Sequence, residues 1–128
     1  MAKEVLVARD GTPPAGAYSQ GWRAGDFVFV TGTGPGGIDG RVAGDTIEEQ
    51  TTRTIDNVEA VLSVAGAALP NAVRVNVHLA DVAMFDAFDS VYRLRFSEPF
   101  PTRTTVGSDL GHTQGMLIEI DCIAYVGG

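Results

Sequence analysis

The sequence is poor in the residues on which several classes of protein depend. Its 128 residues include a single cysteine, Cys122, so no disulfide can form within the chain. Lys3 is the only lysine, and nine basic residues against sixteen acidic ones give a net charge of −7. No run of Lys and Arg breaks this balance. An acidic chain without a basic run repels a phosphate backbone, so the composition disfavours nucleic-acid binding.

Long apolar segments are missing as well. A membrane-spanning helix needs about 20 consecutive apolar residues, and no such span or signal peptide is recognisable. We therefore expect a soluble, cytoplasmic protein. The length favours one domain over residues 1–128, which is enough to bury roughly two thirds of the unfolded chain's surface.

Metal and cofactor sites are not indicated either. His78 and His112 do not stand at metal-ligand spacing with another His, Cys or carboxylate, so we predict no metal site. The Gly-rich segment 31–37 has no lysine and fits no dinucleotide or P-loop spacing, which favours a plain loop at the end of a strand. Cys122 falls in an apolar row, where a buried, inert thiol is expected.

The C-terminal segment 116–126 is the most informative stretch. Alternate residues of a strand point to opposite faces, so one face of this strand is wholly apolar and needs a cover. The other face carries Leu117, Glu119, Asp121, Ile123 and Tyr125. Two carboxylates in a mostly apolar row suggest a face that another subunit covers, beside a ligand pocket. Arg103 begins what we expect to be the neighbouring strand, where its guanidinium and a carboxylate could converge.

The remaining pattern alternates strands and helices. Asp45 or Thr46 can cap a helix that Gly66 ends, and a second helix is expected over residues 82–96 with its aromatic residues on one side. Strands are expected at 4–7, 17–23, 27–31, 73–79, 102–106 and 116–126. This order predicts an α+β fold, a mixed sheet with two helices packed on one face. The other sheet face has no element left to cover it, which favours oligomerisation.

Taken together, these segments resemble the RidA/YjgF family of enamine/imine deaminases over nearly the whole chain. The resemblance rests on short pieces in a fixed order and spacing, at residues 16–20, 29–32, 35, 50–51, 55–62, 65–66, 75–79, 81, 85, 91–92, 101–103 and 118–124. It implies a chorismate-mutase-like fold and a homotrimer, whose sheets form a central barrel with sites in clefts between subunits.

The resemblance also implies catalytic roles for two residues. Arg103 corresponds to the family arginine that grips the substrate carboxylate, and Glu119 corresponds to the glutamate that holds the attacking water. An arginine binds a carboxylate with two parallel hydrogen bonds, and a glutamate can deprotonate water. A 2-iminobutanoate/2-iminopropanoate deaminase of this kind needs no cofactor and no metal. Its partners would be a small 2-imino or 2-enamino acid and two further copies of the chain.

Four further positions are implied to contact the substrate, and three of them depart from the family's usual residue. Tyr18 corresponds to the aromatic wall of the pocket. Thr31 stands where many members have Ser, Asp89 where the archetype has Asn, and Thr105 where many have Cys. The segment between Tyr92 and Arg103 is also shorter than in the archetype.

Three functions remain open at this point. The first is hydrolytic deamination of 2-aminoacrylate-type enamines and 2-imino acids to 2-keto acids and ammonia. The second is a non-catalytic trimeric module that binds small carboxylates or a partner protein. The third is a pathway-specific relative that acts on a larger enamine, imine or related intermediate. A simple ion pair between Arg103 and Glu119 across adjacent strands is the structural alternative to catalysis.

Overall fold

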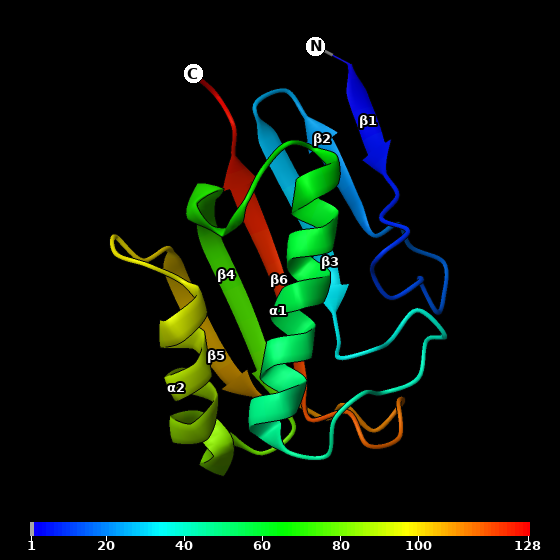
Figure 1. Cartoon of the computed structure of the whole chain (residues 1–128), viewed down its shortest axis with the longest axis vertical. Helices are drawn as coiled ribbons and strands as arrows, with labels where there is room; N and C mark the ends of the chain where they lie inside the picture. The colour runs from blue at the N-terminus through cyan, green and yellow to red at the C-terminus, as the bar shows by residue number, and fades with distance from the viewer. Residues whose placement is uncertain (1) are drawn as a thin grey trace.

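A computed structural model describes residues 2–128 as one mixed sheet with two helices on one of its faces (Figure 1). The α+β fold expected from the sequence is therefore confirmed. In chain order the elements are β1 (Lys3–Leu6), β2 (Gly21–Ala24), β3 (Phe27–Thr33), α1 (Ile47–Val64), the 3₁₀ turn η1 (Leu69–Asn71), β4 (Ala72–Leu79), the 3₁₀ turn η2 (Val82–Met84), α2 (Phe85–Arg95), β5 (Thr102–Gly107) and β6 (Ile118–Tyr125).

The strands follow the order β1-β2-β3-β6-β4-β5 across the sheet. All neighbouring pairs are antiparallel except β4 and β5, which run parallel. Strand β4 thus lies between β5 and β6, with Val75 opposite Arg103 on one side and His78 opposite Glu119 on the other. The expectation that Arg103 begins the strand next to Glu119 is wrong, because the loop between β5 and β6 carries the chain past β4.

Helix α1 begins where its capping residues predict. Thr46 Oγ1 accepts a hydrogen bond from the Glu49 N–H, and Glu49 Oε1 accepts one from the Thr46 N–H, both at 3.1 Å. These bonds satisfy backbone donors that a helix start leaves free. Gly66 follows the helix with φ of 72°, a conformation that glycine adopts at little cost. Apolar side chains along one side of α1 are buried, with Ile55 and Leu62 fully inaccessible to solvent.

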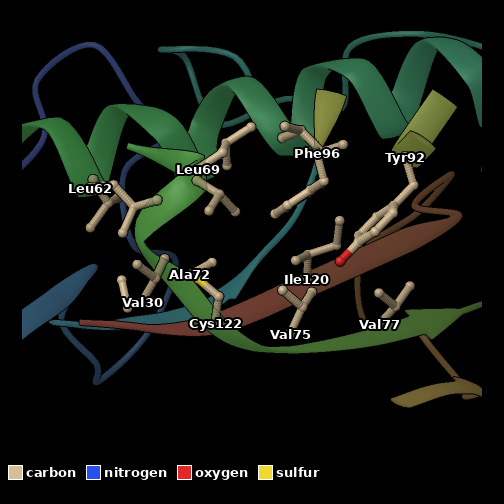
Figure 2. Close-up of a cluster of buried hydrophobic side chains, with 14 of the residues drawn as sticks. Val30, Leu62, Leu69, Ala72, Val75, Val77, Tyr92, Phe96, Ile120 and Cys122 are labelled. Carbon is tan, nitrogen blue, oxygen red and sulfur yellow. The ribbon is translucent and has the colours of Figure 1, made fainter. Parts of the chain in front are cut away.

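Helix α2 contributes aromatic side chains to the same core. Phe88 and Tyr92 of the helix are buried, as is Phe96 directly after it, and the Tyr92 and Phe96 rings stack with centroids 4.2 Å apart. Figure 2 shows Leu62 and Phe96 above Val75 and Cys122 of the sheet. Burial raises the pKa of the Cys122 thiol to about 12, as an inert buried cysteine requires. The predicted start of this helix at residue 82 is a 3₁₀ turn, and the α-helix proper begins at Phe85.

The opposite sheet face, which we call the open face, leaves large apolar side chains exposed. Phe27, Phe29 and Tyr125 keep 43%, 42% and 41% of their surface accessible. Glu119, Asp121, Ile123 and Tyr125 of β6 point to this face, because the residues that alternate with them are buried beneath the helices. The predicted division into two faces is confirmed for Ile118–Tyr125. Met116 and Leu117 of the predicted strand 116–126 lie outside β6, and Leu117 packs against the core instead of the open face.

Three local predictions are corrected by the structure. Residues 17–20 are a loop, so β2 is only the short strand from Gly21. Strand β3 continues through Thr33 into the segment that was expected to be a Gly-rich loop. A register irregularity near the start of β4 buries Ala72 and leaves Val73 44% exposed, although simple alternation places Val73 in the core.

Candidate active site

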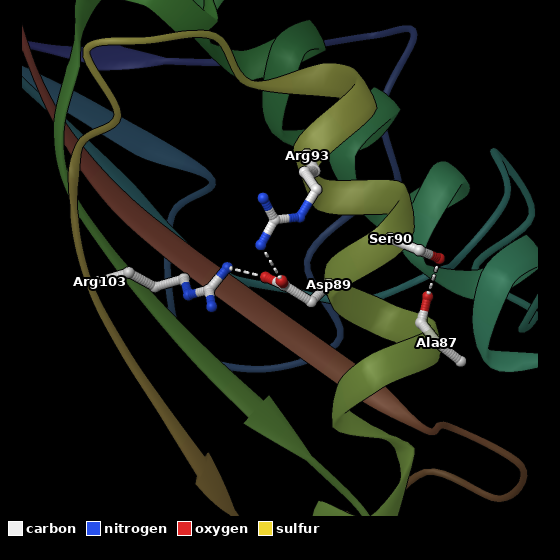
Figure 3. A network of polar contacts seen from close by, with 5 residues as sticks. All are labelled: Ala87, Asp89, Ser90, Arg93 and Arg103. Carbon is white, nitrogen blue, oxygen red and sulfur yellow. Dashed lines mark hydrogen bonds and ion pairs between the residues drawn. The ribbon is translucent and has the colours of Figure 1, made fainter.

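Arg103 points from β5 toward the helices. Its Nη1 donates a hydrogen bond to Asp89 Oδ1 at 2.7 Å, and Arg93 Nη2 donates to Asp89 Oδ2 at 2.9 Å (Figure 3). Asp89 and Arg93 stand one turn apart on α2, so the helix holds one carboxylate between two guanidinium groups. The side chains of Arg103 and Asp89 are only 21% and 17% exposed. Arg103 therefore pairs with Asp89 rather than Glu119, and the cross-strand ion pair that was the structural alternative to catalysis is not formed.

Aromatic rings fix the Arg103 guanidinium from the side of the core. Its central carbon lies 5.4, 5.3 and 4.5 Å from the ring centroids of Phe85, Phe88 and Tyr92. Such cation–π contacts restrict the guanidinium to one orientation. Burial also raises the pKa of the Tyr92 hydroxyl to about 12. The arginine is thus held in place before any ligand arrives.

A cavity of about 450 Å³ opens beside this arginine, and we call it the arginine pocket. It is lined by Phe85, Asp89, Tyr92, Arg93, Phe100, Pro101 and Arg103. Partial burial acts to raise the pKa of Asp89, but the hydrogen bonds from Arg103 and Arg93 and their positive charges outweigh it, so this pKa is lowered. The pocket therefore presents two cations and one carboxylate against apolar walls.

Glu119 belongs to a second cavity, of about 340 Å³, which we call the glutamate pocket. Tyr18 and Thr31 line it together with Glu119, as do His112 and residues of the loops around Pro14 and Gly34. The Glu119 carboxylate lies against Gly32, where an added Cβ would stand 2.8 Å from Oε2. A glycine at this position lets the carboxylate lie flat on β3.

Buried amide side chains hold the loops around the glutamate pocket. Asn57 Nδ2 donates to the carbonyl oxygens of Gly34 and Gly36 at 2.9 and 2.7 Å. Gln20 bonds to the backbone of Ala8 and Thr12, and Gln50 bonds to Gly44, Gly115 and Leu117. The sequence reasoning gave these residues no role. The sequence did hold a sign of this role, because Gln50 and Asn57 are polar residues on the side of α1 that is buried.

The six predicted residues thus separate into two groups. Arg103 and Asp89 meet on the helical side, and Thr105 shares that side of β5 because it lies two residues beyond Arg103. Tyr18, Thr31 and Glu119 meet in the glutamate pocket, with Glu119 on the open face. Within one chain, Arg103 and Glu119 cannot hold the same small molecule.

The other polar residues considered from the sequence have local partners. Asn76 Nδ2 donates to Asp121 Oδ1 at 2.9 Å, and His78 Nδ1 shares a hydrogen bond of 2.7 Å with Ser108 Oγ. Within residues 2–128, no cluster of three His, Cys, Asp or Glu side chains is arranged to hold a metal ion. In the same part of the chain, no helix has the length and apolar character that crossing a membrane requires.

Comparison with known proteins decides the family. The family described as Endoribonuclease L-PSP matches residues 10–126. A RutC family protein of Pyrococcus abyssi is 41% identical over 98% of both chains. The chain belongs to the RidA/YjgF family.

Other members of the RidA/YjgF family share the fold of this chain, and one of them is named as a deaminase. The crystal structure of yeast Mmf1 superimposes with a TM-score of 0.91, at 31% identity over 98% of this chain and 100% of that one. A chloroplastic protein of Arabidopsis thaliana named Reactive Intermediate Deaminase A is 31% identical over 97% of this chain and 66% of its own length. The resemblance read from the sequence is therefore confirmed as membership of the RidA/YjgF family.

Proposed function

We propose that this chain hydrolyses 2-imino acids, and the enamines that tautomerise to them, to 2-keto acids and ammonia. Membership of a family that includes a protein named Reactive Intermediate Deaminase A supports this class of reaction. The observation that carries the proposal is the division of the site residues between two pockets. A held arginine occupies one pocket, and a carboxylate beside an aromatic ring and a hydroxyl occupies the other.

The proposed reaction needs an anchor, a water and a route for protons. The enamine first takes up a proton at carbon 3 and gives up one from its nitrogen, which makes it the imine. Water then adds to the imine carbon, the carbon–nitrogen bond breaks, and ammonia leaves as the carbonyl forms. Arg103 would hold the substrate carboxylate, and Glu119 would take the proton of the attacking water and pass it to the leaving nitrogen. Because the imine is already reactive, orientation supplies much of the acceleration.

We infer that two copies of the chain complete each site, within the homotrimer expected from the sequence. Phe27, Phe29 and Tyr125 on the open face are exposed in one chain, and an exposed apolar surface of this kind is typical of an interface. Arg103 of one copy and Glu119 of another could then face the same substrate. In this arrangement Tyr18 and Thr31 would accompany Glu119, while Asp89 and Thr105 would accompany Arg103.

The experiment that tests the function is a direct imine assay. An amino-acid oxidase makes the imine of leucine or methionine in situ, and its decay is followed by absorbance with and without the purified protein. We expect faster decay that scales with protein concentration, and no acceleration with heat-denatured protein. Equal decay rates with and without the folded protein would refute the deaminase proposal and favour the non-catalytic binding module.

A pathway-specific substrate is a second candidate, and Asp89 favours it. The arginine pocket contains the Asp89 carboxylate, which is already bonded to Arg103. It is also lined by the apolar residues Phe85, Phe100 and Pro101, and this combination of groups favours a particular substrate. Comparing imines of small and large amino acids in the same assay distinguishes a general deaminase from a specialised one. The cytoplasmic location expected from the sequence also remains part of the proposal, and cell fractionation tests it.

A further inference from the structure

Asp89 places a fixed negative charge inside the arginine pocket. Its two oxygens accept hydrogen bonds from Arg103 Nη1 at 2.7 Å and Arg93 Nη2 at 2.9 Å (Figure 3). A guanidinium carries five N–H groups, so Asp89 engages only part of the hydrogen-bonding capacity of Arg103. A ligand carboxylate that binds the same guanidinium must therefore lie beside the Asp89 carboxylate.

An ionised carboxylate accepts hydrogen bonds and donates none. A 2-keto acid offers only acceptors next to its carboxylate, so both of its polar groups are repelled by Asp89. A 2-imino acid or a 2-amino acid carries N–H groups on the atom attached to carbon 2. Once the carboxylate is on Arg103, that nitrogen is within a few bonds of the anchor and can donate to Asp89.

We propose that Asp89 makes the arginine pocket select ligands that carry an N–H donor beside their carboxylate over the 2-keto acids of the same carbon skeleton. This inference rests on the proposed function, because it takes Arg103 as the carboxylate anchor. It assigns Asp89 as a specificity-determining residue whose charge separates the nitrogen-bearing reactant from the oxygen-bearing product.

This selection has a consequence for turnover. Hydrolysis replaces the C=N group of the reactant by C=O, so the donor to Asp89 disappears when ammonia leaves. The product then keeps its contact with Arg103 but acquires an unfavourable contact with Asp89. Release of the 2-keto acid is thereby favoured over its retention.

The test compares alanine with pyruvate, which share a three-carbon skeleton and differ in the group at carbon 2. Calorimetry measures the affinity of both for the full-length wild-type protein and for Asp89→Asn. The Asn side chain keeps the size of Asp and an oxygen that can accept from Arg103, but it removes the charge. The control is Asp86→Asn, which removes the same charge from an exposed position of α2 outside the arginine pocket.

We expect wild type and Asp86→Asn to bind alanine more tightly than pyruvate. In Asp89→Asn, pyruvate affinity should rise and the alanine-to-pyruvate preference should fall by about tenfold or more, the usual worth of a charge-assisted hydrogen bond. Thermal melting of each variant verifies that it is folded. An unchanged preference in folded Asp89→Asn, or an equal change in Asp86→Asn, would overturn the inference.

The outcome is separable from that of the imine assay. If the preference for alanine over pyruvate is lost in Asp89→Asn, the selection by Asp89 is supported even when the protein does not accelerate imine decay. Conversely, if the protein turns over imine but Asp89→Asn keeps the alanine-to-pyruvate preference, the deaminase function stands and Asp89 does not determine its specificity.

Discussion

Adding one methyl group at Gly32 changes the position of Glu119 without altering its chemistry. The new Cβ would stand 2.8 Å from Glu119 Oε2 and 2.9 Å from Cδ, whereas ordinary contact begins at 3.4 Å. The carboxylate must therefore retreat by about 0.6 Å, and a misplacement approaching 1 Å can cost about 10²-fold in rate. The φ of Gly32 is not positive, so alanine fits the backbone, and the clash is with the end of a flexible side chain. We expect Gly32→Ala to stay folded and to lose about tenfold to a hundredfold in imine turnover.

The assay is imine decay at saturating and at low substrate, with a thermal melt of the same sample. Gly11→Ala is the matched control, because its added Cβ would meet nothing closer than 3.6 Å. We expect this control to keep the wild-type rate. A Gly32→Ala protein that melts like wild type and turns over imine at the full rate would refute the idea that the placement of Glu119 matters for catalysis.

Variants in the two pockets and the size of the protein in solution provide further tests. Arg103→Lys should be nearly as inactive as Arg103→Ala, because lysine keeps the charge but loses the planar contact with Asp89 and the aromatic rings. The expected loss in transition-state binding is about 2–5 kcal/mol. Near-wild-type imine turnover by the lysine variant would contradict the anchor role of Arg103. Glu119→Gln should fold and bind a 2-keto acid while its turnover falls by at least about 10²-fold, and unchanged imine decay would leave Glu119 a structural residue. Light scattering should give a trimer, because Phe29 and Tyr125 are exposed on the open face; a monomer at micromolar concentration would contradict the shared site.

Much of the fold was predictable because local rules decide it. The Thr46–Glu49 capping box, the turn at Gly66 and the alternation along β6 depend on short-range hydrogen bonds and on burial. Each is encoded within a few residues. Val73 is exposed, against the simple alternation of the predicted strand 73–79, because a register irregularity shifts that alternation, and sequence alone carries no clear sign of such an irregularity.

The candidate site was predictable as a set of residues but not as an arrangement. Arg103 and Glu119 were correctly placed on strands, yet chain order suggested that these strands were neighbours. Their separation by β4 is a property of topology, which depends on how the whole sheet packs. The pairing of Arg103 with Asp89 depends likewise on where α2 crosses β5, and no spacing in the sequence specifies that contact.

The most direct test of the account is complementation between two inactive variants. Arg103→Lys and Glu119→Gln proteins are unfolded and refolded together, and mass spectrometry verifies that mixed oligomers form. If each site takes Arg103 from one copy and Glu119 from another, random mixing in a ring of identical interfaces restores about a quarter of the sites. We predict that imine turnover rises to about a quarter of the wild-type value. Mixed oligomers with no more activity than the separate variants would contradict a site shared between copies.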